Sequence, residues 1–373
     1  MITPRDELFG HASAAPIHQV QVRDTPHSVF TERFWYMGTV KPAGDMVFAL
    51  GMGYYPNRRV MDGFAGITIG NVQYNYRASR RVGEGDLAIE AGALRIEVQA
   101  GLRMHRIVLA ANESGIEMDL SFIGTMDINE EGRETITTRA GVIADLNRYA
   151  QCGRYEGWIR VNGNRIDLTP ATCWGARDRS WGLRVEARTD ETTPPVTHIS
   201  PLLYAFFCAQ FETRAIHFFL KEKAPGAYRF IAGSESGPFG EGAPCAQVLS
   251  VAHELTWHDD PLGQSLKSGS FTVGFADGRS KTLQVRALPG RFFHKGGLYG
   301  GLRGWFQGDD KGMQYAEHDR YDLACAADRT VLRTAGEQVI EIRDGDQVGY
   351  GTLQCGVSAG YPKYSSIQQH PAM

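Results

Sequence analysis

The feature that most constrains the fold of this 373-residue chain is a regular alternation of apolar and polar residues. Every second residue is apolar in the run Leu94–Met104, and the same pattern recurs in Ile116–Phe122. Successive side chains of a β-strand point to opposite faces of its sheet, so a period of two residues indicates a half-buried strand. We therefore predict one strand over residues 94–104, with a bend at Gly101, and a second strand over 116–122.

Turn signals separate several of these strand-like runs. Asn162-Gly163, Asp277-Gly278 and Asp344-Gly345 each lie between two such runs, as tight hairpins require because their central residues adopt positive φ angles. The 44 glycines, 15 tyrosines and 18 phenylalanines also suit a chain of many strands and turns. Helical periodicity is scarce, and its best candidate is the segment from Val142 to Tyr149. The sequence predicts an all-β, largely antiparallel fold with at most a few short helices.

A polar segment with two consecutive prolines, Ala187–Val196, divides the chain near its midpoint. Such a composition is typical of a linker, and each half is long enough for one β-barrel or sandwich. We predict an N-terminal β domain over residues 1–190 and a C-terminal β domain over residues 191–373.

The charge balance and the hydropathy restrict the partners. The chain has 39 basic and 42 acidic residues, a net charge of −3, so it lacks the basic excess of a nucleic-acid-binding protein. Its first fifteen residues lack the features of a signal peptide, and its most apolar stretch, Ile199–Phe211, is too short for a transmembrane helix. We expect a cytoplasmic protein that binds a hydrophobic small molecule. The sequence leaves open whether it forms a homodimer.

Common metal and cofactor motifs do not fit the sequence. His253 and His258 are five residues apart, which on a strand places them on opposite faces and disfavours a shared metal ion. In Gly233–Gly237 the middle residue is Glu235, where the nucleophile elbow of a serine hydrolase requires serine. We expect neither a metal nor a cofactor.

One segment resembles a known family. Gly175–Gly182 reads Gly-Ala-Arg-Asp-Arg-Ser-Trp-Gly, which is similar to the signature of the carotenoid 1,2-hydratase (hydroxyneurosporene synthase)/AttH-like family. Trp158 with its turn at Gly163 and, more loosely, the segment from Phe34 to Asn57 extend this resemblance. The family is built from two consecutive lipocalin-like domains. The resemblance therefore implies two tandem antiparallel lipocalin-like β-barrels or sandwiches.

The resemblance also implies a class of function. In the carotenoid hydratases a His and a Trp of this segment, with a Tyr and an Asp one strand further on, are proposed to protonate a terminal alkene. Here Asp178 and Trp181 match, but Arg179 stands in the place of the His, and the following strand offers Tyr204 without an Asp. We therefore do not expect a carotenoid hydratase in the narrow sense. The wider group includes fungal enzymes that close polyene rings without a cofactor.

The segment from His198 to Leu220 combines ionisable and aromatic residues, and we predict that it forms a pocket wall. His217 and Tyr204 are the preferred acid–base candidates, because burial among aromatic rings tunes such groups for proton transfer. Asp178 and Arg179 of the signature complete the candidate catalytic set. The candidate substrate-binding residues are Trp174, Trp181, His198, Phe206, Phe219 and Glu317.

Each of these residues also has a structural interpretation. Trp174 and Trp181 can pack the seam between the domains while Arg177 and Asp178 form an ion pair there. Polar groups within a core strand can simply be satisfied by their neighbours.

Two further acidic positions stand out. In the segment Tyr315–Asp322, alternation places Glu317, Asp319 and Tyr321 on one face, either as part of a proton relay or as an exposed strand edge. Asp62 follows two tyrosines and is a candidate carboxylate at a barrel mouth.

Together these observations predict a cofactor-independent enzyme acting on a hydrophobic unsaturated substrate of terpenoid, steroid or polyketide-like type. It would be a hydratase or other lyase, or an isomerase or cyclase, using acid–base proton transfer and conformational control in an apolar pocket. The alternative is a non-catalytic carrier of an apolar small molecule. Two or more ionisable side chains that converge in a closed apolar cavity would favour the enzyme, and a cavity lined only by apolar groups and ordered water would favour the carrier. A filled barrel with all polar groups at the domain seam would contradict both hypotheses and leave a structural role.

Overall fold

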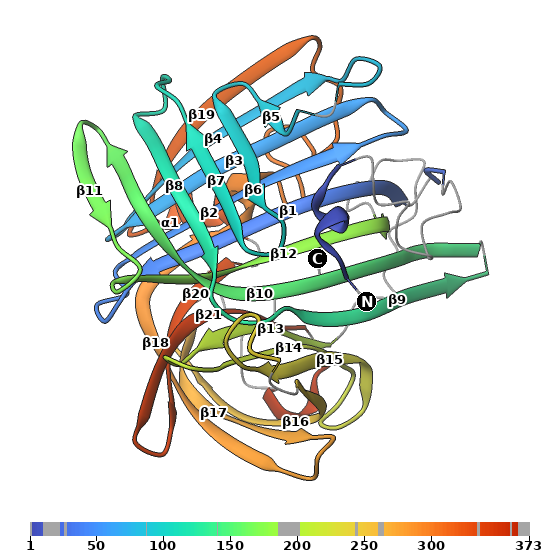
Figure 1. The fold of residues 1–373 in the computed structure, drawn as a ribbon, viewed down its shortest axis with the longest axis vertical. Helices are drawn as coiled ribbons and strands as arrows, with labels where there is room; N and C mark the ends of the chain where they lie inside the picture. The colour runs from blue at the N-terminus through green and yellow to red at the C-terminus, as the bar shows by residue number, and fades with distance from the viewer. Residues whose placement is uncertain are drawn as a thin grey trace.

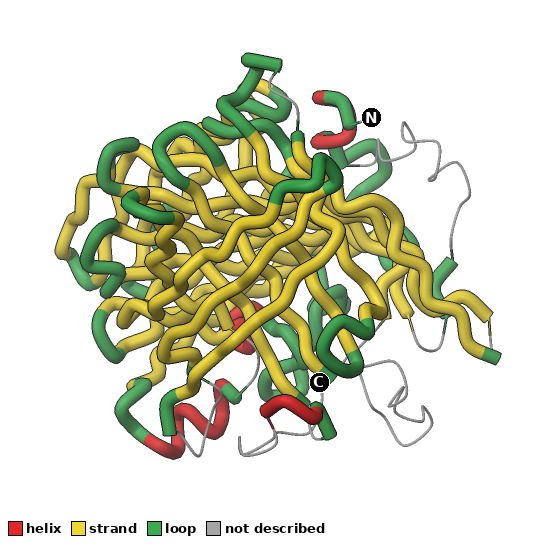
Figure 2. The backbone as a smooth tube through the Cα atoms, turned by 90° about the horizontal axis from the view of Figure 1, so that it is seen from below, coloured by secondary structure: helices red, strands yellow, loops and turns green. Residues whose placement is uncertain are grey.

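The computed structural model describes residues 2–9, 23–25, 28–86, 88–139, 141–185, 202–242, 245–259, 265–333, 336–358 and 360–364. Strands make up most of this part of the chain (Figures 1 and 2), and its one α-helix is α1 (Ala326–Leu332). Neighbouring strands run antiparallel. The predicted all-β, antiparallel class is therefore confirmed. No helix in the described ranges is both long and apolar enough to cross a membrane.

The first unit is a 13-stranded sheet in the order β19-β4-β3-β2-β1-β12-β10-β8-β7-β6-β5, with β9 and β11 also paired to β10. Its strands are β1 (Ser28–Val40), β2 (Met46–Tyr55), β3 (Val60–Ile69), β4 (Val72–Arg81), β5 (Glu90–Ala91), β6 (Leu94–Ala100), β7 (Met104–Leu109), β8 (Ile116–Gly124), β9 (Asn129–Thr138), β10 (Gly141–Val161), β11 (Asn164–Leu168), β12 (Cys173–Val185) and β19 (Gln314–Asp322). The sheet curls until β5 contacts β3 and β4. An apolar core that includes Phe34, Phe48 and Leu120 fills the space inside the curl.

The second unit is a closed eight-stranded barrel. Its strands are β13 (Leu203–Gln210), β14 (Ala215–Glu222), β15 (Tyr228–Ser236), β16 (Ala246–Trp257), β17 (Leu266–Phe275), β18 (Ser280–Phe293), β20 (Gly336–Asp344) and β21 (Gln347–Val357). Fully buried aromatic rings fill its interior, with Phe207 and Phe218 stacked at 4.6 Å between ring centroids and Phe271 packed edge-on against both. The barrel interior is thus a packed core.

Two local predictions were wrong. The segment from Val142 to Tyr149 is not a helix but part of strand β10, which pairs with β9 on one side and β12 on the other. Cross-strand pairing on both edges outweighs the short helical pattern there. Residues 94–104 form a hairpin, β6 and β7, rather than one strand, and Gly101 lies in its turn beside Leu102, whose φ is +61°.

The division between the units follows the chain closely, with one exception. The expected boundary at residues 190/191 and its proline pair lie outside the described residues. Strand β19 comes from the C-terminal half but pairs with β4 at the edge of the N-terminal sheet. It therefore ties the two halves of the chain together.

An ion-pair network holds β19 in place. Arg77 on β4 is fully buried and donates to Glu317 and Asp319 on β19, with Nη2 2.8 Å from Glu317 Oε1 and 2.7 Å from Asp319 Oδ2. The expected shared face of Glu317, Asp319 and Tyr321 is confirmed, since the Tyr321 hydroxyl also donates to Asp319. This face is bound to β4, although β19 is itself the edge strand of the sheet and its alternate residues are exposed.

This network predicts a large cost for removing its cation. Arg77→Met leaves two carboxylates without their partner in a largely buried site, and we expect the free energy of unfolding to fall by about 3–5 kcal/mol. Arg81→Met is the matched control on the same strand, because Arg81 pairs with Asp310 at the surface. Urea denaturation of both variants checks this expectation. Equal small losses for the two variants would contradict it.

Candidate functional site

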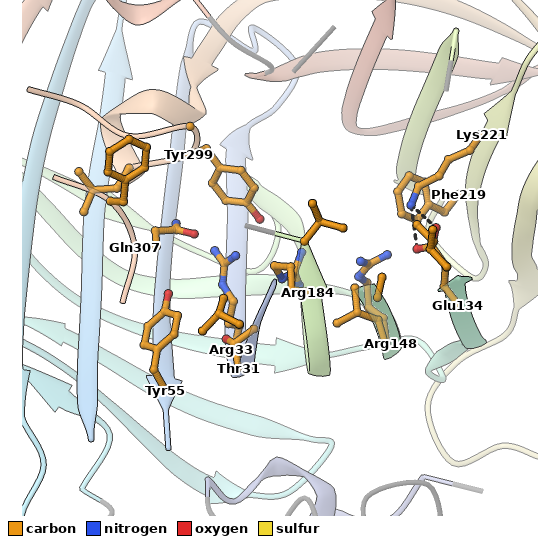
Figure 3. A pocket seen from close by; sticks show the side chains of 18 residues that line it. Thr31, Arg33, Tyr55, Glu134, Arg148, Arg184, Phe219, Lys221, Tyr299 and Gln307 are labelled. Atoms are coloured by element: carbon orange, nitrogen blue, oxygen red, sulfur yellow. Dashed lines mark hydrogen bonds and ion pairs between the residues drawn. The ribbon is translucent and has the colours of Figure 1, made fainter. Parts of the chain in front are cut away.

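A cavity of about 300 Å³ lies between the N-terminal sheet and the outer surface of the barrel (Figure 3). Strand β14 of the barrel and the connection between β18 and β19 form its far wall. Its wall combines apolar and charged side chains. The lining includes Val29, Thr31, Arg33, Tyr55, Glu134, Ile136, Leu146, Arg148, Arg184, Phe219, Lys221, Leu298, Tyr299, Phe306 and Gln307.

Strand register explains how polar residues from distant parts of the chain meet at this face. Arg33 on β1 lies opposite Gly53 on β2 and opposite Ser180 on β12. Gly53 in turn faces Asp62 on β3, and Ser180 faces Arg148 on β10. Residues directly opposite one another share a face of the sheet. One row across five strands therefore presents two arginines and a carboxylate to the barrel.

Gly53 makes room within this row. A Cβ atom at position 53 would lie 2.9 Å from the Tyr55 hydroxyl and 3.0 Å from Asp62 Oδ1. A side chain would therefore displace a cavity-lining tyrosine or the carboxylate beside it. The absence of a side chain at Gly53 lets both polar groups occupy the same face.

Two arginines of the wall lack carboxylate partners. Arg33 is 5% exposed and stacks under the Tyr299 ring, 4.9 Å from its centroid, but it makes no hydrogen bond or ion pair within the described ranges. Arg184 donates from Nη2 to the Ser180 hydroxyl at 2.9 Å, and its Nε has no partner in the described part of the chain. Burial, together with the charge of Arg33, lowers the pKa of Arg184 to about 10.

The other two cations of the wall are paired. Arg148 contacts Glu131 at 2.8 Å, and the same carboxylate accepts from His217 Nε2 at 3.0 Å. Burial alone would raise the pKa of Glu131, but Arg148 and His217 bring it below its ordinary value. Lys221 contacts both carboxylate oxygens of Glu134 at 2.5 and 2.7 Å (Figure 3).

Asp178 lies next to this wall. It faces Trp35 on β1 and Ala150 on β10, one step along the sheet face from the row that contains Arg33 and Arg148. It is partly buried, and no hydrogen bond to it is present among the described residues. Burial raises its pKa to about 6 despite the nearby arginines. Asp62 also has its pKa raised to about 6 by burial, although the Gly308 N–H and Arg33 oppose this shift.

The neighbouring residues of the signature face the opposite way. Arg179 is fully buried and donates to Glu32 at 2.7 Å and to the Asp6 carbonyl at 3.1 Å. Arg177 pairs with Glu7, which also accepts from the Tyr149 hydroxyl at 2.7 Å. These contacts anchor the 3₁₀ turn Pro4–Glu7 to the sheet. Alternation thus separates Asp178, on the cavity side, from two anchoring arginines.

The predicted site residues fall into separate groups. Phe219 lines the cavity, and Phe206 and His217 lie behind it, with Phe206 5.2 Å from Phe219 and 4.9 Å from His217 between ring centroids. Tyr204 lies on the same side of the barrel, packed against Gly356, where burial raises its pKa strongly. It does not line the cavity described above.

The remaining candidates lie away from the cavity. Trp174 packs at the seam, with the Lys41 ammonium 3.6 Å above its ring and Tyr350 of the barrel against its edge. Trp181 packs against Tyr149 on the opposite face of the sheet. Glu317 belongs to the β19 network. His198 lies outside the described residues.

Most residues of the cavity wall were not predicted from the sequence. Arg33, Arg148, Arg184 and Tyr299 gave no motif, and only the register of the strands brings them together. One signal was available, because Arg33 is a charged residue next to the aromatic run Phe34-Trp35-Tyr36, and a charge in a buried strand requires a partner or a ligand.

The cavity also differs in place from the expected one. The barrel is filled and charged groups lie at the seam, but the seam itself contains a partly open space that several ionisable side chains line. This arrangement favours a functional site over a purely structural seam.

Comparison with known proteins identifies the family. The model of a family of unknown function (DUF8625) matches residues 2–361. The chain belongs to this family. No protein of curated function matches its sequence.

Solved structures show a shared fold. An AttH-like protein from Nitrosomonas europaea has a TM-score of 0.55 at 12% identity over 89% of this chain and 93% of that chain. Kievitone hydratase from Nectria haematococca has a TM-score of 0.48 at 12% identity over 88% and 89%, and CghA one of 0.44 at 12% over 90% and 89%. The first likeness confirms the AttH-like fold. The other two scores are too low to support an argument.

The anchoring geometry of Arg179 predicts a stability effect. Arg179→Met leaves the Glu32 carboxylate without its buried partner, so we expect the free energy of unfolding to fall by about 3–5 kcal/mol. Arg165→Met, which removes an ion pair at the surface, is the control. Urea denaturation compares the two variants. An Arg179→Met protein as stable as the control would show that Arg179 is not an anchor.

The raised pKa of Asp178 predicts a pH dependence. A pKa of about 6 in the folded state, against 3.8 for the free side chain, means that the folded state binds the proton more tightly. The resulting stabilisation is complete below pH 4 and is lost as the pH rises through 6. Asn imitates the protonated form, so Asp178→Asn should gain about 1–3 kcal/mol of stability relative to wild type between pH 4 and 7.

Urea denaturation at several pH values measures this difference. Asp119→Asn is the control of opposite sign, because its hydrogen bond with Arg106 lowers the pKa of Asp119. That variant should lose stability relative to wild type as the pH rises. A difference between Asp178→Asn and wild type that stays constant from pH 4 to 7 would refute the assignment for Asp178.

Proposed function

We propose that the protein is a cofactor-independent enzyme that transfers a proton on a hydrophobic, unsaturated substrate bound between the sheet and the barrel. The environment of the Asp178 carboxyl supports this proposal. The Asp178 carboxyl is partly buried next to the cavity wall without itself lining the cavity, is influenced through space by three cavity-lining arginines and has a pKa of about 6. A carboxyl with this pKa can both give and accept a proton near neutral pH.

The proposed chemistry regenerates the acid in each cycle. Protonated Asp178 gives its proton to one carbon of a double bond, so that a C–H bond forms and the π bond breaks. The carboxylate then accepts a proton from a neighbouring C–H group, which shifts the double bond, or from a water molecule that adds to the second carbon. The first course is an isomerisation and the second a hydration. Each course leaves Asp178 protonated again.

The cavity supplies the second part of the proposal. Apolar side chains such as Leu146, Phe219 and Leu298 can hold a flexible hydrophobic chain in one conformation. Restricting reactants in this way can contribute about 7–11 kcal/mol to catalysis. A cyclisation therefore needs few ionisable groups. The likeness to the carotenoid hydratase/AttH-like family supports a lyase, isomerase or cyclase, and terpenoid, steroid or polyketide-like compounds as the substrate class.

His217 has an indirect place in this proposal. It holds Glu131, which holds Arg148 at the cavity wall. His217 is thus a positioning residue rather than a proton donor to the substrate.

The alternative is a carrier that binds the same molecule without changing it. The convergence of charged groups and of a carboxyl with a raised pKa favours the enzyme. A carrier would need only the apolar part of the wall.

Deuterium exchange distinguishes the two functions. Small molecules retained by the purified protein are identified by untargeted mass spectrometry and then incubated with fresh protein in D₂O. We expect a product that carries deuterium at carbon, and we expect Asp178→Asn to reduce its rate of formation at least 100-fold.

Arg160→Met, which changes a surface ion pair of the sheet, is the control and should form product at the wild-type rate. Retained molecules that stay chemically unchanged and free of deuterium would support the carrier. Full activity of Asp178→Asn would overturn the role of Asp178.

A further inference from the structure

Four cationic side chains line the cavity, and carboxylates of the described residues pair with two of them. Lys221 is paired with Glu134, and Arg148 is paired with Glu131. Arg33 and Arg184 have no carboxylate within ion-pair distance among the residues that the structure describes. The two unpaired guanidinium groups belong to adjacent strands, β1 and β12, and both line the same space (Figure 3).

Two guanidinium groups without a carboxylate partner cost free energy when no ligand occupies the cavity. A guanidinium group removed from water loses solvation that only a carboxylate, a phosphate or an equivalent acceptor restores. Arg33 is 5% exposed, and the Tyr299 ring lies over its guanidinium group with its centroid 4.9 Å away. The hydroxyl groups of Tyr299 and Tyr55 and the carboxyls of Asp62 and Asp178 outweigh the effect of burial and raise the pKa of Arg33, so its charge persists. Five N–H donors in a fixed plane therefore line a cavity in which the described residues place no carboxylate against them.

The nearby acids do not fill this role. Asp62 accepts a hydrogen bond from the Gly308 N–H at 2.6 Å, on the far side of Gly53 from Arg33. Asp178 faces Trp35, which is two residues along β1 from Arg33 and on the same face. Both carboxyls influence the arginines through space, but neither lies within 4.0 Å of a guanidinium nitrogen of Arg33 or Arg184.

We infer that Arg33 and Arg184 form a subsite for a carboxylate group, so that the substrate is a hydrophobic unsaturated acid rather than a neutral hydrocarbon. This inference rests on the proposed function and names its substrate class. Arg33 and Arg184 bind the carboxylate, while Phe219 and Leu146 contact the hydrocarbon part.

Matched pairs of ligands test the subsite. Benzoate, cinnamate and dodecanoate are each compared with the corresponding alcohol by isothermal titration calorimetry, in a buffer free of phosphate and sulfate. We expect at least one carboxylate to bind the wild-type protein at least tenfold more tightly than its alcohol. In Arg33→Met and in Arg184→Met this preference should fall below threefold, and Arg33→Lys should keep part of it.

The unfolding temperature of each variant is measured as well, to show that the variant folds. Because Arg33 lacks a carboxylate partner, Arg33→Met should unfold at a temperature equal to or above that of wild type, whereas Arg77→Met should unfold well below it. Arg106→Met, which changes a surface ion pair, is the control and should keep the full carboxylate preference.

The outcomes separate this inference from the proposed function. If no carboxylate is preferred over its alcohol, or if the preference survives in Arg33→Met, the carboxylate subsite is wrong, and the deuterium experiment still decides the enzyme. Asp178→Asn should keep the carboxylate preference. If the preference is present but Asp178→Asn forms product at the wild-type rate, the subsite stands and the proposed proton donor is wrong.

Discussion

The structure depends on the pairing of β1 with β12 at the centre of the N-terminal sheet. Because side chains alternate between the faces of paired strands, this register fixes which residue of each neighbouring pair meets the barrel. Arg33 and Asp178 face the barrel, whereas Glu32 and Arg179 face away and bond to each other. A shift of one residue would exchange the two sets and place the anchoring pair in the cavity.

Because of this alternation, the segment Arg177–Arg179 contributes side chains both to the anchor of the N-terminal turn and to the face beside the cavity. On the curled side, Arg177 and Arg179 bind the N-terminal turn through Glu7 and the Asp6 carbonyl, in a network without surface exposure. On the barrel side, the described residues offer no acceptor to Arg184 Nε, no carboxylate to Arg33 and no hydrogen-bond donor to Asp178. Arg177 and Arg179 each have a buried carboxylate partner, whereas Arg33 and Arg184 have none among the described residues, and a buried cation without such a partner is where a ligand acceptor is expected.

The sequence was sufficient for the class of fold and for part of the site. Period-two alternation and turn residues predicted antiparallel strands, and the signature segment led directly to Asp178. The sequence pattern could not show that β19 pairs with the N-terminal sheet, because that pairing depends on Arg77, which is far away in the chain. The cavity was missed for the same reason, since Arg33 and Tyr299 meet only through tertiary packing. The helix predicted over 142–149 failed because pairing on both edges of β10 overrides local pattern.

The protonation state of Asp178 is the most direct test of the proposed proton donor. Carbon-13 NMR of protein labelled at the aspartate carboxyl carbons follows each side chain through a pH titration, and Asp178→Asn assigns the relevant signal. We expect a midpoint near pH 6 for Asp178, since burial raises its pKa to about 6. A midpoint below pH 4 would show an ordinary ionised carboxylate, and it would contradict the proposal that Asp178 delivers a proton at this site.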